Sequence, residues 1–395
     1  MALMCKDCAS ILLFDPDIGK LTCKSCGRSY DLEDSKQIAS SDLRSLYSAE
    51  HHRQTINFTI YTCGTCGARI SFHGSEMNAV CSFCGNSDMR PEGEIERRKP
   101  DAILPFSLSK EKAISTVKEH LTELPYLASE YRDMDLTSAR GIYIPYYIVN
   151  AEYKAIIDVR SHKSSPAEYR SVSCNFDKLI LEASKVLLDE ASVMVEPYDL
   201  NDLKTFHEGY LQGFSADMAD KDPEDIYHQA VNATRHMVED ECKKEKIVTR
   251  KNKFFDGDYR PKFTGNAVYA LFPVWFVTGE VKGRKITFLV NGQTGKVFGN
   301  PPYSEKIFNK NVALVSLITV PLLFALLYFV CRLLAYTIII PVYIADTVFA
   351  IAGFVTFISA LWGISRYRLR AAEKLIITST SGSLLDFVNR RSKDV

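Results

Sequence analysis

The chain has 395 residues, 46% hydrophobic and 24% charged, which is enough for two or three domains with a sizeable core. Its 48 Lys and Arg side chains balance 48 Asp and Glu, and this zero net charge excludes a globally basic nucleic-acid-coating protein. Eleven cysteines stand out in this composition, and their spacing carries the first functional signal.

The N-terminal part holds two copies of a CxxC-x14-CxxC pattern, and every cysteine of the second lies 58 positions after its counterpart in the first. Two such turns on neighbouring hairpins can direct four thiolates at one tetrahedral zinc ion. Because no ligand position is left for water, each zinc is predicted to be structural. We predict two small β zinc ribbons at residues 1–40 and 59–95, joined by a linker at 41–58. The two ligand sets are Cys5, Cys8, Cys23 and Cys26, then Cys63, Cys66, Cys81 and Cys84.

Other uses of these cysteines stay open from the sequence. Four thiolates can also hold an iron–sulfur cluster. A redox CxxC normally stands alone beside a βαβ unit, and disulfides require an oxidising compartment. The remaining cysteines, Cys174, Cys242 and Cys331, follow no pairing pattern, which favours a reducing compartment.

Residues 100–303 predict an α+β soluble domain. Ser109 can cap a helix whose apolar residues recur at helical spacing, and residues 140–160 are rich in β-branched and aromatic residues, as in strands. A charge-rich amphipathic helix is predicted over residues 222–245. Three strands then follow, with turns at Lys282-Gly283 and Asn291-Gly292.

This middle region shows no catalytic signature. Lys296 follows a glycine but precedes Val297 and a predicted strand, so the phosphate-loop pattern fails. The histidines are scattered without a metal or nucleophile pattern. An aromatic group could line a ligand site but fits the core of a sheet better: Tyr143, Tyr146, Tyr147, Phe272 and Trp275. We therefore predict no catalytic residues, no organic cofactor and no enzymatic activity.

The C-terminal part is strongly apolar. From Val312 to Ile364, only Arg332 and Asp346 are charged, which predicts a transmembrane helical hairpin within 311–365. Basic residues flank both ends, so we expect a multi-pass protein of the inner (cytoplasmic) membrane, with both termini and the 366–395 tail in the cytoplasm. Snorkelling, mutual pairing and proton relay stay open for the two charged residues.

The order of motifs resembles a known family. The CxxC pairs are followed by ILPF and a helix, then GIYIPYYIVNAEY, EPYDLNDLKTFHEGYLQGFSAD and LFPVWFVTGEVKGRKITFLVNGQTGKVFG. This arrangement resembles the bacterial membrane-associated, transcription-factor-IIB-type zinc-ribbon proteins. The resemblance implies a role in envelope stress beside phage-shock protein A-like, SPFH or TPM-domain proteins.

Taken together, these features predict a membrane-anchored zinc-ribbon adaptor that docks protein partners. A membrane-tethered nucleic-acid-binding protein is the first alternative, and an accessory subunit of a transporter or membrane enzyme is the second. Charge favours the adaptor: residues 1–40 hold five Lys or Arg against six Asp or Glu, and residues 60–92 hold two against three. Phosphate binding requires a basic face, which neither ribbon supplies.

Overall fold

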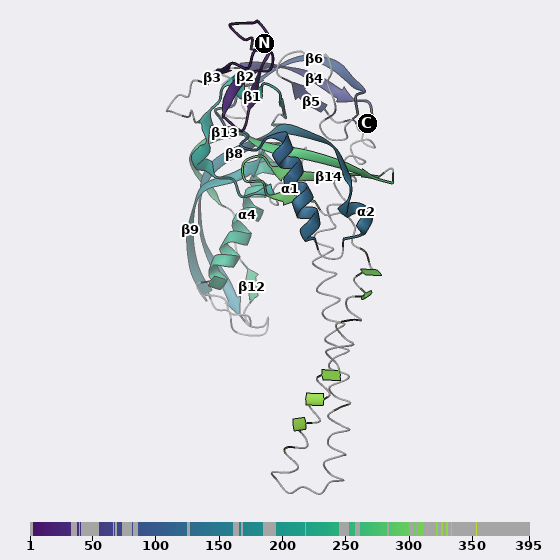
Figure 1. Cartoon of the computed structure of the whole chain (residues 1–395). Coiled ribbons are helices and arrows are strands. Elements are labelled where there is room, and N and C mark those ends of the chain that lie inside the picture. The colour runs from purple at the N-terminus through teal and green to yellow at the C-terminus, as the bar shows by residue number, and fades with distance from the viewer. Residues whose placement is uncertain are drawn as a thin grey trace.

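A computed structural model describes the protein over most of residues 3–32, 55–72, 86–160, 169–184, 195–244, 253–256 and 261–299, together with Cys81 and some isolated positions. Within this part, the strands form two sheets, one of three strands and one of twelve. Figure 1 shows the small sheet beside the N-terminus, at one end of the larger sheet.

The three-stranded sheet belongs to the first ribbon, a name we use for residues 3–32. Its antiparallel strands are β1 (Leu12–Asp15), β2 (Lys20–Cys23) and β3 (Ser29–Tyr30). Alternate residues of β1 and β2 are buried, as the two-residue period of a strand requires. One face of the ribbon is therefore apolar and needs a partner surface.

The twelve-stranded sheet is built on two long antiparallel strands, β8 (Asp135–Arg160) and β13 (Lys262–Val281). Their β-branched and aromatic residues suit a sheet that is covered on both faces. β13 continues through a hairpin into β14 (Arg284–Asn291) and then β15 (Val297–Phe298), while β9 (Tyr169–Glu182) pairs with β8. The three predicted strands within residues 268–299, with turns at Lys282 and Asn291-Gly292, are confirmed. Four short strands complete this part: β7 (Ala102–Ile103), β10 (Lys204–Thr205), β11 (Ser215–Ala216) and β12 (Lys253–Asp256).

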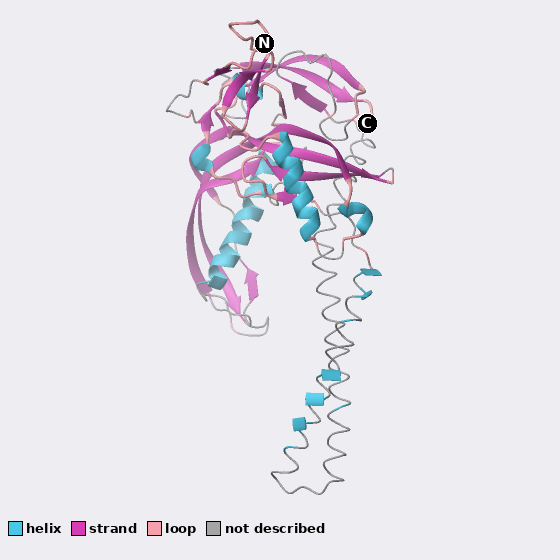
Figure 2. Ribbon diagram, viewed as in Figure 1, coloured by secondary structure: helices cyan, strands magenta, loops and turns pink. Residues whose placement is uncertain are grey.

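Two longer helices pack on this sheet (Figure 2). Helix α1 (Lys110–Glu123) follows Ser109 as predicted and buries Ala113, Val117 and Leu121. Helix α4 (Pro223–Lys244) confirms the second predicted helix and packs against β9. The shorter helical segments are α2 (Ser129–Arg132), η3 (Leu200–Asp202) and η4 (Glu208–Leu211).

The core has a separate cluster on each face of the central strands. Tyr143 and Trp275 join the cluster that contains α1 and the apolar face of the first ribbon. Ile142 and Tyr146 alternate with Tyr143 along β8 and join the second cluster. All five aromatic residues singled out in the sequence are buried, at 0–5% exposure, so they act as core residues of the sheet.

The strands of the second cysteine repeat belong to the large sheet. β4 (Thr55–Cys63) pairs with β5 (Arg69–Phe72) and β6 (Met89–Arg98), and β5 pairs with β11, which in turn pairs with β8. We call β4, β5, β6 and Cys81 the second ribbon. The predicted fold class is corrected here, because the described chain is mostly β-sheet and one sheet unites this ribbon with the middle region.

The predicted transmembrane hairpin is also corrected. Among the residues that the structure describes, none of the helices has the length and apolar character needed to cross a membrane. Most of 311–365, and all of the 366–395 tail, lie outside the described residues, and the positions described there are isolated helical residues or pairs. The prediction used the apolar composition and length of the segment, and these do not by themselves establish a helix that spans a membrane. The multi-pass membrane location depended on this hairpin and is corrected with it.

Candidate metal centre

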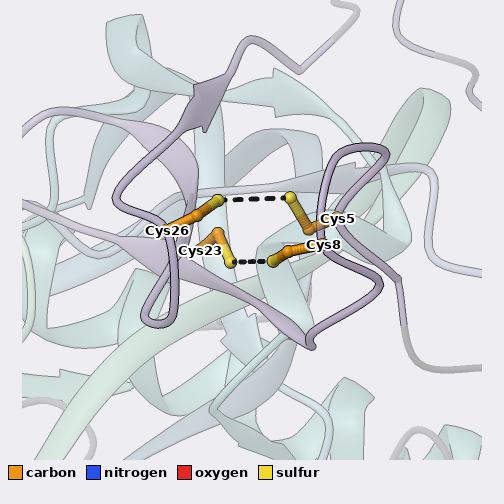
Figure 3. A group of neighbouring side chains, drawn as sticks. All are labelled: Cys5, Cys8, Cys23 and Cys26. Atoms are coloured by element: carbon orange, nitrogen blue, oxygen red, sulfur yellow. Dashed lines mark hydrogen bonds between the residues drawn. The ribbon is translucent and has the colours of Figure 1, made fainter.

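The first ribbon brings Cys5, Cys8, Cys23 and Cys26 together from two turns. Their sulfur atoms all lie within 4.8 Å of one another, so the four cysteines could hold a metal ion. Figure 3 shows the side chains converging in two facing pairs, with Sγ–Sγ distances of 3.6 Å for Cys5 and Cys26 and 3.4 Å for Cys8 and Cys23. Cys5 and Cys23 are buried, whereas Cys8 and Cys26 are exposed.

These distances distinguish between the uses that the sequence left open. Four thiolates around zinc at about 2.3 Å place their sulfurs roughly 3.8 Å apart in a tetrahedron, close to the observed pair distances. A disulfide would need a bond of about 2.05 Å, so the two pairs are not bonded. The set fits a four-thiolate metal ion, and it leaves no open position at which a substrate could bind the metal.

Backbone hydrogen bonds shape each turn of this site. The Cys5 N–H donates to the carbonyl of Ser10 at 2.7 Å, and the Cys23 N–H donates to that of Arg28 at 2.8 Å. Four residues after each of these cysteines, Ala9 and Gly27 have positive φ angles of 56° and 74°. The left-handed conformation lets the chain fold back so that both sulfurs of a CxxC point to one side.

Polar neighbours favour the thiolate forms of two ligands. Contact with the Tyr30 hydroxyl at 3.2 Å lowers the pKa of Cys5 to about 6, and the backbone N–H of Ser10 lowers the pKa of Cys8. The Tyr30 hydroxyl also contacts Asp7, and its single proton can be donated to only one of these two acceptors at a time. Asp7 in turn pairs with Arg28 at 2.9 Å. Thiolates are the form in which cysteine binds metal.

Tyr30, Asp7 and Arg28 were not identified from the sequence. Asp7 directly precedes Cys8, Arg28 directly precedes β3, and Tyr30 ends β3. The CxxC pattern gives no information about which of these neighbours turn toward the sulfurs. Hydrogen-bonded neighbours of this kind orient metal ligands. The sequence offered one signal for these neighbours, because a tyrosine, Tyr30, follows the second CxxC pair of the first ribbon.

The second ribbon repeats the turns of the first, although Cys66 and Cys84 lie outside the described residues. The Cys81 N–H donates to the carbonyl of Asn86 at 2.8 Å, and the Gly67 N–H donates to that of Cys63 at 2.9 Å. With the shift of 58 residues, these bonds match those from Cys23 to Arg28 and from Ala9 to Cys5 in the first ribbon. Gly67 has a positive φ of 67°, like its counterpart Ala9 at 56°. Both described cysteines are buried, Cys63 at 1% and Cys81 at 0%.

Strand pairing supports the same correspondence. In the first ribbon, Met4 forms an isolated antiparallel bridge with Ile11. Its counterpart after 58 residues is the pair Thr62 and Arg69, which are partners between β4 and β5. The two repeats therefore share local backbone geometry as well as cysteine spacing.

Comparisons with known proteins add one relationship. The chain is similar to the uncharacterized protein YdjG of Bacillus subtilis (strain 168), with 26% identity over 332 residues that cover 76% of this chain and 90% of that protein. The similarity thus extends far beyond the length of a ribbon. No protein-family model matches the chain, and no solved structure does so either.

Proposed function

We propose that the chain binds two structural zinc ions and acts as an adaptor that docks other proteins through its first ribbon. The supporting observation is the four-sulfur group, which uses every ligand position of a tetrahedral ion and leaves none for catalysis. The repeated turns at Cys63 and Cys81 support a second ion held together with Cys66 and Cys84.

Elemental analysis tests the metal part of this proposal. Purified protein should contain about two zinc ions per chain, and Cys23→Ser or Cys81→Ser should each remove about one, because a missing thiolate opens the site. Cys174→Ser is the matched control, since Cys174 lies in β9 outside both ligand sets and should leave the zinc content unchanged. Bound iron with a visible charge-transfer band would contradict the zinc assignment.

The docking surface that we propose lies beside the first CxxC turn. Met4 and Ile11 are neighbours across their bridge and remain 57% and 53% exposed. The metal would hold this pair in place, because Cys5 and Cys8 lie between the two residues. Adjacent exposed apolar side chains on a small rigid module are typical of protein contacts.

Nucleic-acid binding is the second candidate and has weaker support. A zinc ion with four thiolates adds a formal charge of two minus to ribbons that are already slightly acidic. The ion pairs at the site, such as Arg28 with Asp7 and Lys20 with Asp31, further neutralise its basic groups. Binding of DNA at physiological salt, with a steep dependence on salt, would reverse this ranking.

Partner capture tests the adaptor role. Wild type, Ile11→Asp and Ile18→Asp would be used as bait, with phage-shock protein A-like, SPFH and TPM-domain proteins as purified candidate partners. Ile18 is the matched control, because it is also 52% exposed but lies in the β1–β2 turn. We expect Ile11→Asp to lose binding with its zinc retained, while Ile18→Asp keeps both. Equal partner binding by wild type, Ile11→Asp and Ile18→Asp would exclude the surface at Met4 and Ile11 as the docking site.

A further inference from the structure

The first ribbon contacts the large sheet without joining it. Its three strands form a separate sheet, and its apolar side chains Leu12, Phe14 and Leu21 are each 4–5% exposed. Among the described residues, the ribbon is linked to the larger unit by a backbone hydrogen bond from the Phe14 N–H to the Gln212 carbonyl at 3.0 Å. The Leu3 N–H adds a weaker bond to the Gln212 side chain at 3.4 Å. Side-chain packing therefore holds the ribbon in place.

Phe14 is the central contact of this packing. Its ring meets Tyr210 edge-on at 5.1 Å and lies 6.4 Å from Phe214. Phe214 in turn stacks on Phe106 at 4.3 Å and lies 5.8 Å from Trp275. The ribbon thus covers an aromatic surface, formed by Phe106, Tyr210, Phe214 and Trp275, that belongs to the larger unit.

A loop adjacent to this surface is shaped to receive the ribbon. A Cβ on Gly209 would lie 2.4 Å from Leu32 Cδ2 and 3.3 Å from Leu21 Cδ1, so any larger residue would require the Leu32 side chain to move. Gly213 has a φ of 90°, and a Cβ on this residue would lie 3.3 Å from its nearest neighbour, Leu13 Cδ2. Both glycines meet residues of the first ribbon, which indicates a specific fit.

An ion pair holds the β1–β2 turn of the first ribbon against α1. Asp17, in the β1–β2 turn, accepts from Lys112 Nζ of α1 at 2.9 Å. Hydrogen bonds from Lys112, and further ones from Ser109, lower the pKa of Asp17. The Ser109 side chain makes no capping bond at the start of α1 and instead donates to Asp17.

A groove remains open along this contact. It has a volume of about 510 Å³ and lies between the hairpin, through Leu13 and Thr22, and the sheet, through Arg140, Phe214 and Trp275. The first ribbon consequently covers the aromatic surface as a separable part, and open space already lies between one side of the ribbon and the large sheet.

We infer that the first ribbon is a zinc-held lid: zinc at Cys5, Cys8, Cys23 and Cys26 keeps the aromatic surface covered, and loss of this ion exposes it while the large sheet stays folded. This inference rests on the proposed zinc at the first site. A module of about 30 residues buries too little apolar surface to keep its shape without metal. The strands of the large sheet pair independently of it, so the sheet does not require the lid.

Hydrogen exchange and fluorescence test the lid in the full chain. The sequence has two tryptophans, so a Trp362→Phe background leaves Trp275 as the only reporter. In this background, Cys8→Ser should lose one zinc, and residues 206–216 should lose amide protection by about tenfold or more. Trp275 emission should shift to longer wavelength, while β8 and β13 keep their protection. Cys8 is exposed, so the serine itself does not disturb the core.

Two comparisons make the result decisive. Phe14→Ala should open the lid with both zinc ions retained, and Cys174→Ser should change neither zinc content nor exchange. Unchanged protection of 206–216 in zinc-depleted Cys8→Ser would overturn the inference, because the lid would then close without metal. Loss of protection throughout β8 and β13 would also overturn it, since the ribbon would then be part of one folding unit. A wild type without zinc would instead contradict the proposed function.

Discussion

The two ribbons share their cysteine spacing and turn geometry but differ in their connection to the rest of the molecule. The first has its own sheet and meets the large unit mainly through side chains, with a backbone hydrogen bond from Phe14 to Gln212, whereas β5 of the second pairs with β11 inside the twelve-stranded sheet. Their cysteines also belong to different core clusters: Cys5 and Cys23 lie with Phe14 and α1, while Cys63 and Cys81 lie with Ile142 and Tyr146.

This difference separates two roles of a structural metal. In the first ribbon, a metal maintains a module that can leave the surface that it covers. In the second, a metal would hold strands whose partners continue through the main sheet. The same ligand set therefore predicts a local effect of metal loss at one site and a global effect at the other.

The largest expected effect is on global stability. Cys81→Ser should lower the free energy of unfolding of the large sheet by on the order of 5 kcal/mol, because it removes a buried ligand and its metal. Cys23→Ser should change that transition by only about 1 kcal/mol, since opening of the first ribbon is a local event. Denaturant unfolding followed by circular dichroism gives both values.

The comparison would fail if the two variants destabilised the sheet equally. Both cysteines are 0% exposed, so burial of the introduced hydroxyl is matched between them. A difference between the variants then reports the connection of each site to the sheet.

An intermediate effect is expected at Gly141, beneath the first ribbon. A Cβ there would lie 2.5 Å from Phe214 Cδ1 and 3.0 Å from Phe106 Cζ, so Gly141→Ala must displace the aromatic surface. We expect a loss of about 1–3 kcal/mol in the free energy of unfolding, as for overpacking of a core. The zinc content should stay at two, and partial lid opening should appear as a red shift of Trp275. Unchanged emission would mean that Phe214 does not link β8 to the ribbon.

Much of the local structure could be predicted from the sequence. Helix α1 began after Ser109 as expected, and the cysteine spacing identified four residues whose sulfurs do converge. Both features depend on residues close together in the chain. Helical period and CxxC geometry are local rules, and such rules hold without knowledge of the tertiary structure.

The features that failed or were missed depend on distant residues. The pairing of β5 with β11 joins Ser71 to Ala216, and no local pattern indicates a partner 145 positions away. The contact of Phe14 with Tyr210 joins residues that are still further apart in the chain. The transmembrane prediction failed for a different reason, because it used hydropathy and length alone, and no helix among the described residues can cross a membrane.

The smallest expected effect concerns Asp17, which fastens the lid to α1. The Asp17 and Lys112 side chains are 42% and 60% exposed, so solvent screens their ion pair and Asp17→Asn should cost the closed lid about 0.5 kcal/mol or less. Lys112 lowers the pKa of Asp17 below its ordinary value of 3.8, so the pair stabilises the closed state above about pH 4. The stabilisation is lost as pH falls through the lowered pKa. Hydrogen exchange of residues 206–216 at pH 6–8 should therefore show a constant small difference between wild type and Asp17→Asn, and 1 M salt should reduce it. A difference that survives high salt would assign the effect to the hydrogen bonds with Ser109 and α1, and the charge of Asp17 would then contribute nothing to lid closure.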